Sequence, residues 1–218
     1  FETVGEVFEV VGESKLSQHE KNRILGETEL LVSFSEFNDI AKMSAHHKRA
    51  YQLLGTKASL INMKSTWSFG SPSVMCLYHS HSGELDKELS LMDECMTCYY
   101  KLTGGDGSGS EYAMRAEAEL LHGNFYAAET LAHRAMFEAR EKQQDSVYQC
   151  GLFVLANTAV VRADESRLFE VLFSMSESAA SNYEGVGRYT LDTFFGYIDA
   201  YTCSAGEAVV WLAKADIQ

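Results

Sequence analysis

The chain has 218 residues, a hydrophobic fraction of 46% and a formal net charge of −13, from 18 basic and 31 acidic residues. This composition suits a folded protein with a sizeable core and excludes wholesale disorder. The densest basic cluster is the pair Lys48-Arg49, so neither a nucleic acid nor an anionic membrane surface is expected as a direct partner.

Cysteine usage and the absence of targeting signals predict the compartment. The five cysteines are an odd number and mostly lie far apart, which favours reduced thiols and a cytoplasmic location. No apolar run reaches the length that spans a bilayer, and no secretory signal is visible. The chain opens at Phe1 in mid-pattern without an initiator methionine, so we expect a fragment of a larger protein.

Helical periodicity runs along the whole chain. Apolar residues at helical spacing predict a short helix over residues 1–12. Five helix pairs follow, and we expect them as hairpins near 19–54, 72–102, 110–141, 146–180 and 188–216. The single proline, Pro72, and the lack of strand alternation favour an all-α fold.

Local signals predict where some of these helices begin. Ser71 as a cap and Pro72 in the first turn predict a helix that runs to Ser82. Ser110 is expected to cap the third hairpin. The glycine-rich run 104–109 before it predicts a flexible linker.

A similar short turn recurs between the two helices of each pair. Its middle residues are 38, 83, 123, 163 and 205, which is a spacing of roughly 40 to 45 residues. Helix–turn–helix units at such a period are typical of a solenoid. We therefore predict a single domain over 1–218, a right-handed solenoid of about five antiparallel hairpins, and a binding function in preference to catalysis.

The third hairpin has the clearest pattern. Residues 116–128 read Ala-Glu-Ala-Glu-Leu-Leu-His-Gly-Asn-Phe-Tyr-Ala-Ala, and Ala135 follows. This resembles the tetratricopeptide repeat, in which small residues flank a Gly-polar-aromatic turn. Small side chains at Ala116, Ala128 and Ala135 would let neighbouring helices approach closely. The pattern departs from that repeat at Ala163, where glycine is usual, and in its period, which exceeds roughly 34 residues.

A narrower resemblance covers residues 30–139. Its segments are 33–40 (Ser-Phe-Ser-Glu-Phe-Asn-Asp-Ile), 66–72 (Thr-Trp-Ser-Phe-Gly-Ser-Pro) and 116–128. They resemble the tetratricopeptide-type sensor region of MalT-like, LuxR-type bacterial regulators, which also carry an N-terminal nucleotide-binding module and a C-terminal DNA-binding helix-turn-helix. This chain has neither a Gly-x-x-x-x-Gly-Lys-Ser/Thr loop nor a basic helix-turn-helix. The resemblance therefore implies the sensor segment alone, with DNA bound only through a module missing from this chain.

No catalytic or metal-binding set is recognisable. Cys95 and Cys98 form a C-x-x-C without a second Cys or His pair, and we interpret them as small buried hydrophobes. His79 and His81 fall on different faces of the expected helix, so we expect hydrogen-bonded or solvated histidines. No Ser/His/Asp set or carboxylate box is found. We expect no catalysis, no cofactor and no metal.

The candidate binding residues come from the first helix of each pair and from one loop. In such arrays the first helices line a concave groove, which suits a protein segment, a peptide or a small polar effector such as an oligosaccharide. Large aromatic residues in the loop before Pro72 either pack at the edge of the solenoid or contact a ligand. The candidates are Trp67, Phe69, Ser73, Leu77, His81, Glu117, Phe153 and Asn157.

These observations predict a signal-sensing and protein-interaction domain of a MalT-like, LuxR-type transcription regulator. Effector binding would change how the repeats pack against the missing modules. Two alternatives remain open. One is a stand-alone tetratricopeptide adaptor or peptide-binding receptor. The other is an all-α enzyme, which would need a deep pocket with several carboxylates or a bound metal.

Overall fold

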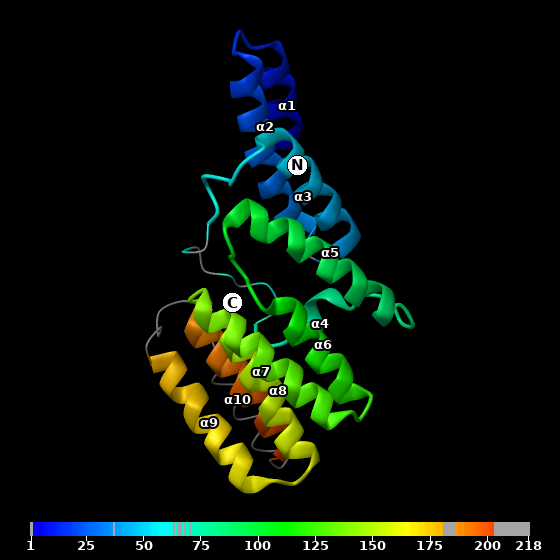
Figure 1. Ribbon diagram of the computed structural model, residues 1–218, viewed down its shortest axis with the longest axis vertical. Helices are drawn as coiled ribbons and strands as arrows, with labels where there is room; N and C mark the ends of the chain where they lie inside the picture. Colours follow the sequence, from blue (N-terminus) through cyan, green and yellow to red (C-terminus); the bar gives the residue numbers. More distant parts are fainter. Residues whose placement is uncertain are drawn as a thin grey trace. The chain divides into compact units, whose positions relative to one another are not determined.

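The computed structural model describes residues 2–202 except 37, 63, 65, 66, 68, 70 and 181–185. Within this part of the chain all regular structure is helical, which confirms the predicted all-α fold (Figure 1). The chain divides into two compact units, unit 1 (Phe1–Ser65 and Leu77–Gly107) and unit 2 (Thr66–Cys76 and Ser108–Gln218). The expected helix near 206–216 lies outside the described residues, and the single solenoid domain stays a prediction.

Unit 1 is built from long helices that pack in sequence order. The helical segments are α1 (Glu2–Glu13), α2 (Gln18–Ser33), the 3-10 turn η1 (Phe34–Glu36), α3 (Ile40–Leu54) and α5 (Leu85–Thr103). α2 packs on α3, and α3 packs on α5 (Figure 1). The approach of α2 to α3 requires Gly26, because a Cβ there would lie 2.6 Å from Leu54 Cγ.

Side-chain caps fix two of these helix starts. The Glu20 carboxylate accepts the Ser17 N–H at 2.8 Å, while Ser17 Oγ accepts the Glu20 N–H, and this reciprocal pair begins α2. Asp39 Oδ1 accepts the Lys42 N–H at 3.0 Å and begins α3. The predicted second helix of the first hairpin, 39–54, therefore agrees closely with the structure.

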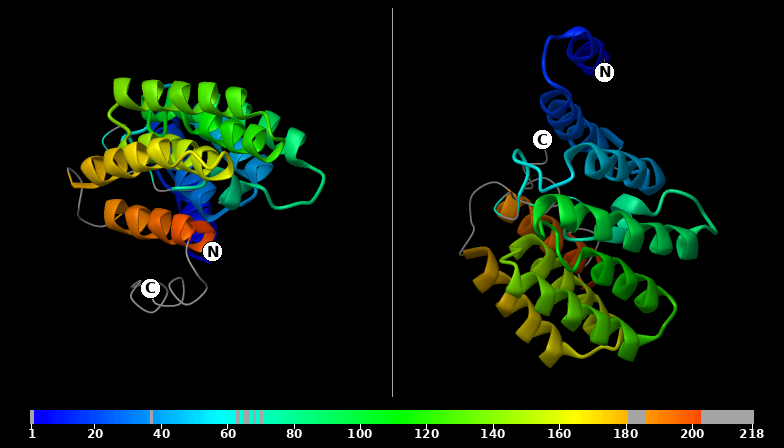
Figure 2. Two further views of the ribbon diagram at one scale, coloured as in Figure 1. Left: turned by 90° about the horizontal axis from the view of Figure 1, so that it is seen from below. Right: turned by 45° about the horizontal axis from the view of Figure 1, so that its top comes forward.

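Unit 2 contains the most regular helical array of the chain. Its helices are α6 (Ser110–Leu121), α7 (Phe125–Glu141), α8 (Asp145–Val161), α9 (Glu165–Ala180) and α10 (Val186–Thr202), and a short helix, α4 (Val74–Tyr78), begins in its 66–76 part. Helices α6 to α9 pack consecutively, and α6 and α10 both pack on α8. Figure 2 shows these helices side by side in chain order, from green to orange.

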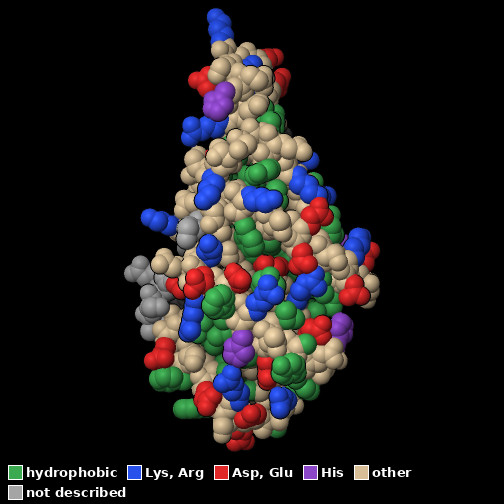
Figure 3. All heavy atoms as spheres, in the orientation of Figure 1, with side chains coloured by type: hydrophobic (Ala, Val, Ile, Leu, Met, Phe, Trp, Pro, Cys, Tyr) green, Lys and Arg blue, Asp and Glu red, His purple; other side chains and the backbone are tan. Residues whose placement is uncertain are grey.

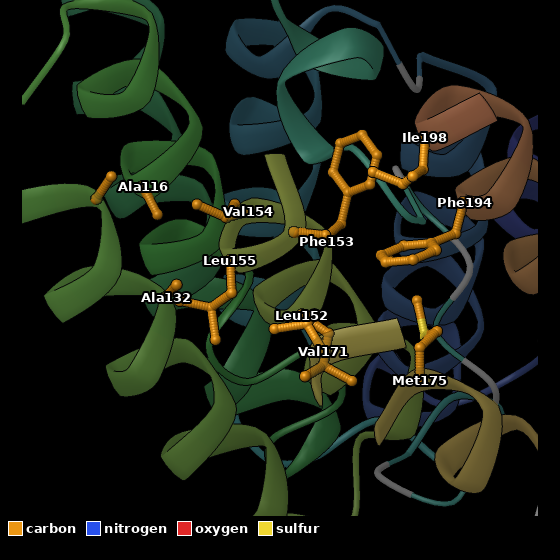
Figure 4. Packing of buried hydrophobic residues seen from close by; sticks show 12 residues of the cluster. Ala116, Ala132, Leu152, Phe153, Val154, Leu155, Val171, Met175, Phe194 and Ile198 are labelled. Atoms are coloured by element: carbon orange, nitrogen blue, oxygen red, sulfur yellow. The ribbon is translucent and has the colours of Figure 1, made fainter. Parts of the chain in front are cut away.

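The core of unit 2 lies around α8. Figure 4 shows its apolar side chains meeting those of α9 and α10, with Phe153 and Phe194 turned toward each other. On the other side of α8 small residues let α7 approach, since a Cβ at Gly151 would lie 3.0 Å from the Ala132 carbonyl oxygen. The alanines that the repeat pattern placed at helix contacts are fully buried; they are Ala116, Ala128 and Ala135.

The recurring turn has the same backbone conformation in three of its expected places. The middle residues Gly83, Gly123 and Ala163 have φ values of 83°, 78° and 53°. This left-handed conformation is easy for glycine and unfavourable for alanine. Ala163 therefore adopts the turn conformation that the repeat pattern assigns to glycine.

The predicted helix from Ser71 to Ser82 is wrong in its extent. The observed helix α4 spans only Val74–Tyr78, and the serine next to its start is Ser73. The Ser73 Oγ accepts the Cys76 N–H at 3.1 Å, which is the contact of an N-terminal cap. The cap lies two residues later than predicted because the bonds that fix this helix start come from a distant helix.

The glycine-rich run joins the two units, as its prediction as a linker implies, but residues 105–109 are buried and Gly104 is half-buried. Gly104, Gly105, Gly107 and Gly109 all have positive φ, so the chain turns tightly here. Within unit 1, the hydroxyl of Tyr99 donates to the buried carboxylate of Asp106 at 2.6 Å. The composition that suggested flexibility instead permits close packing.

Replacing Gly109 by alanine tests this close packing. The added Cβ would lie 2.6 Å from the Ala135 carbonyl oxygen at a φ of +100°. We expect Gly109→Ala to cost about 2–4 kcal/mol, or roughly 4–16 °C in Tm. Gly123→Ala is the control, because φ there is +78° but nothing lies within 4 Å. Equal losses of Tm in thermal unfolding of the two variants would contradict the packing role.

Candidate functional site

Residues 71–76 lie across a face that α6, α8 and α10 share in unit 2. Ser71 Oγ lies 2.9 Å from Thr190 Oγ1 on α10, and Cys76 Sγ lies 3.7 Å from the hydroxyl of Tyr197 on the same helix. These contacts join positions that are 119 and 121 residues apart in the chain. We call residues 71–76 the 71–76 segment and the surface beneath them the α6/α8/α10 face.

Glu117 of α6 is the centre of this contact. Its side chain is buried, with the residue 5% exposed, and its carboxylate accepts the N–H groups of Val74 at 2.8 Å and Met75 at 3.1 Å. The hydroxyl of Ser73 donates to the same carboxylate. The first N–H groups of a helix have no partner inside the helix. Glu117 therefore supplies the acceptors for the start of α4, and the structure brings two predicted site residues together.

Burial controls the ionisation of Glu117. It raises the pKa of Glu117 to about 7, against the opposing effect of the hydrogen bonds from the 71–76 segment. Two titratable groups face it, Cys150 of α8 and Tyr197 of α10. Burial raises the pKa of Cys150, and the hydrogen bond with Cys76 raises the pKa of Tyr197. Both groups therefore stay neutral while Glu117 titrates.

Phe153 supports the α6/α8/α10 face from within the core. Its ring centroid lies 5.7 Å from that of Phe194, in an edge-on arrangement (Figure 4). It lies 5.3 Å from the ring centroid of Tyr197, again edge-on. Asn157 lies one turn further along α8 and is half-buried, and its amide donates to the Phe153 carbonyl at 2.8 Å. Phe153 thus positions Tyr197, which contacts the 71–76 segment.

The two loop aromatics pair with each other. Trp67 is 4% exposed and Phe69 is half-buried, and their ring centroids lie 6.5 Å apart at an interplanar angle of 62°. Loop aromatics were expected either to pack within the protein or to contact a ligand. The burial of Trp67 shows that it packs within the protein.

The other two predicted site residues belong to unit 1. Leu77 is half-buried, and His81 is exposed at a cavity of about 360 Å³. This cavity is lined by the start of α3, by residues near the end of α4 and by the first turns of α5. Its polar groups include Lys87, which forms an ion pair with Glu84 at 2.8 Å.

Glu88 shapes the chain beside this cavity. It is buried, and its carboxylate accepts the N–H groups of Ser80 at 3.1 Å and His81 at 3.3 Å while bonding to His79 Nδ1. Burial acts to raise the pKa of Glu88, but these bonds outweigh it and lower the pKa. The bonds also divert the chain from a helical path, which explains why α4 ends before Ser82.

A buried Cys–His–Ser set in unit 1 has the contacts of a catalytic set, but its thiol and imidazole are not charged. Cys95 Sγ lies 3.3 Å from His47 Nδ1, and His47 Nε2 lies 3.0 Å from Ser33 Oγ. Burial raises the pKa of Cys95 to about 12 and lowers the pKa of His47 to about 4. Both groups are therefore neutral near pH 7, and no thiolate nucleophile forms. The interpretation of Cys95 as a buried hydrophobe is confirmed.

Neither a cluster of metal ligands nor a membrane-spanning helix is found among the described residues. No group of three or more His, Cys, Asp or Glu side chains there is placed to hold a metal ion. No described helix combines the length and the apolar character needed to cross a bilayer. On the face shown in Figure 3, Lys and Arg side chains are interspersed with Asp and Glu.

Sequence reasoning named Glu117 as a lining residue and missed its role as an acceptor. It also missed Glu88, Asp106 and Thr190. One signal was available, because Glu117 lies three and four residues after the fully buried Met114 and Ala113, on an apolar helix face. A carboxylate at such a position must find donors, although the pattern does not say where.

Comparison of the chain with protein-family models, with curated proteins and with solved structures finds no match. The resemblance to MalT-like regulators therefore depends on the three sequence segments quoted above.

The raised pKa of Glu117 should couple the stability of unit 2 to pH. The folded state binds more protons between the ordinary value of 4.5 and about 7, so this group's contribution to stability falls as pH rises through that window. We expect Glu117→Gln to gain about 2–3 kcal/mol relative to wild type between pH 5 and pH 8. Urea unfolding followed by circular dichroism measures this difference.

Glu119→Gln is the matched control for the pH experiment. Glu119 lies on the same helix, and its carboxylate accepts from the Asn124 side chain at 2.7 Å in an exposed position. This variant should follow the pH dependence of wild type. The burial argument fails if Glu117→Gln follows it too.

Proposed function

We propose that the chain is a signal-sensing and protein-interaction domain of a MalT-like, LuxR-type bacterial transcription regulator. Its hairpins form a right-handed, tetratricopeptide-like solenoid in this proposal. The all-α fold supports it, as does the left-handed turn residue at Gly83, Gly123 and Ala163. The protein acts in the cytoplasm and reaches DNA through a module missing from this chain.

The observation that carries the proposal is the way the α6/α8/α10 face holds the 71–76 segment. Glu117 bonds to two backbone N–H groups, which every peptide possesses, and to one hydroxyl. Thr190 and Tyr197 provide hydroxyl groups at the two ends of the segment, beside Ser71 and Cys76. Such a face suits a peptide or a short segment of a partner protein.

The proposed mechanism is a population shift. A partner segment that binds the α6/α8/α10 face contacts the first helices of the third, fourth and fifth hairpins together. It therefore favours the arrangement of these helices in which all three can be contacted. In the parent regulator, partner binding would bias an equilibrium between inactive and active assemblies. The size of this shift is set by the difference between the partner's affinities for the two assemblies.

A second candidate is supported by the cavity beside His81. Its volume of about 360 Å³ falls within the range of small-molecule sites, which is roughly 300–1,000 Å³. Exposed His81 and Lys87 provide polar groups at this cavity. A small polar effector such as an oligosaccharide would bind there in addition to a protein partner.

A thermal-shift screen of peptides tests the main proposal. A peptide at 100 times its Kd stabilises the folded state by about 2.7 kcal/mol, which is roughly 5–10 °C in Tm for a chain of this size. Asn157→Ala should reduce the shift, because the Asn157 amide bonds to the carbonyl of Phe153, whose ring packs on Tyr197 of the α6/α8/α10 face. Phe137→Ala, at an exposed position of α7, should leave it unchanged. A screen without any hit, or hits indifferent to Asn157, would speak against the proposal.

A parallel screen of oligosaccharides tests the second candidate. An oligosaccharide bound in the cavity should raise the Tm of wild type and have little effect on His81→Ala. His122→Ala is the control, since His122 is an exposed histidine of unit 2. If every oligosaccharide leaves the Tm of wild type unchanged, or if His81→Ala responds like wild type, the cavity is not the effector site.

A further inference from the structure

The 71–76 segment has the features of a bound ligand. Its hydrogen bonds to the α6/α8/α10 face join positions at least 42 residues apart in the chain. The helix that it begins, α4, has five residues, which is far below the length at which an isolated helix is stable in water. The conformation of the segment therefore depends on the face that holds it.

The contacts define what the face recognises. Glu117 accepts hydrogen bonds from two consecutive N–H groups, which lack a partner inside the helix only at the start of a helical turn. It also accepts a hydrogen bond from the hydroxyl of the residue before them. The side chain of Val74 is completely buried, while Met75 is half-buried and Cys76 is exposed. Recognition therefore requires a serine followed by a branched apolar residue at a helix start, and tolerates variation after that.

We infer that the 71–76 segment is an intramolecular competitor of the partner, which is a peptide segment that begins a helical turn with serine and a branched apolar residue. This inference rests on the proposed function. It adds to that proposal the chemistry of the partner and the state of the same face before the partner binds. None of the contacts needs a covalent link between segment and face. A segment of another protein with this chemistry can make all of them.

The competition sets the affinity of the face for its partner. A tethered segment has an effective concentration in the millimolar range. The apparent Kd of the partner is therefore its intrinsic Kd divided by the fraction of molecules in which the segment is released. Release is local, because hydrogen bonds of Ser71, Ser73, Val74 and Met75 hold the segment while the helices beneath it belong to the large core of unit 2.

The experiment uses a labelled peptide and an opened variant. The probe is a fluorescein-labelled peptide with the sequence of residues 71–78, carrying Cys76→Ser. The opened variant, Ser73→Ala with Val74→Asp, changes the segment and leaves the face intact. We expect fluorescence anisotropy to show at least about tenfold tighter binding to the opened variant than to wild type. Ser82→Asp, an exposed change of equal charge, should bind like wild type.

Further variants test the recognition itself. In the opened background, Glu117→Gln should weaken peptide binding at least about tenfold, because it removes the charged acceptor. Glu119→Gln in the same background should bind as the opened variant does. A peptide with Ser73→Ala should bind the opened variant more weakly than the probe.

Equal binding of the probe to wild type and to a folded opened variant would overturn the inference, as would no binding to either. A different peptide that raises the Tm of wild type through Asn157 would still leave the proposed function standing. The two failures are therefore distinguishable.

Hydrogen exchange on wild type provides a second readout that needs no destabilised variant. Millimolar probe peptide should reduce the protection of the Val74 and Met75 amides, since their acceptor is taken by the peptide. The amide of Gly123, in a turn of the core helices, should be unaffected. Unchanged protection of Val74 and Met75 at this concentration also overturns the inference.

Discussion

The buried carboxylate of Glu117 is the constraint that organises the α6/α8/α10 face. Removing a carboxylate from water costs several kcal/mol unless hydrogen-bond donors replace the water. The donors come from Ser73, Val74 and Met75, which are more than forty residues away in sequence. The same three bonds therefore satisfy the carboxylate, start α4 and tie the 71–76 segment to unit 2.

Unit 1 uses the same physical solution in other places. Glu88 holds the residues after α4 by their N–H groups, and the Asp106 carboxylate accepts from the buried Tyr99 hydroxyl. In each case a buried carboxyl group accepts hydrogen bonds from polar groups of the chain beside it. Irregular chain is thereby held against helices. The sites proposed here lie where such chain meets the helices.

The sequence was informative about helix bounds and less so about caps, since Ser110 is the first residue of α6 after Gly109 and not its predicted cap. The bounds of α6 to α10 were predicted within two residues, because apolar period and turn residues such as Gly123 act over short distances. The start of α4 and the packing of Gly109 were not predictable, because they depend on Glu117 and Ala135, which lie far away in sequence. The end of α4 depends on Glu88, which is near in sequence but whose contacts no local pattern shows. Of the site, sequence reasoning found Ser73 and Glu117 without their contact, and it placed Phe153 toward a ligand where the structure places it in the core.

The most direct measurement of the central contact is a double-mutant cycle on Glu117 and Ser73. Unfolding free energies of wild type, Glu117→Gln, Ser73→Ala and the double variant are compared at pH 8. A hydrogen-bonded pair of this kind should give a coupling free energy of at least about 1 kcal/mol. Effects that add within about 0.3–0.5 kcal/mol would show that the two residues do not interact, and would contradict the role given to Glu117.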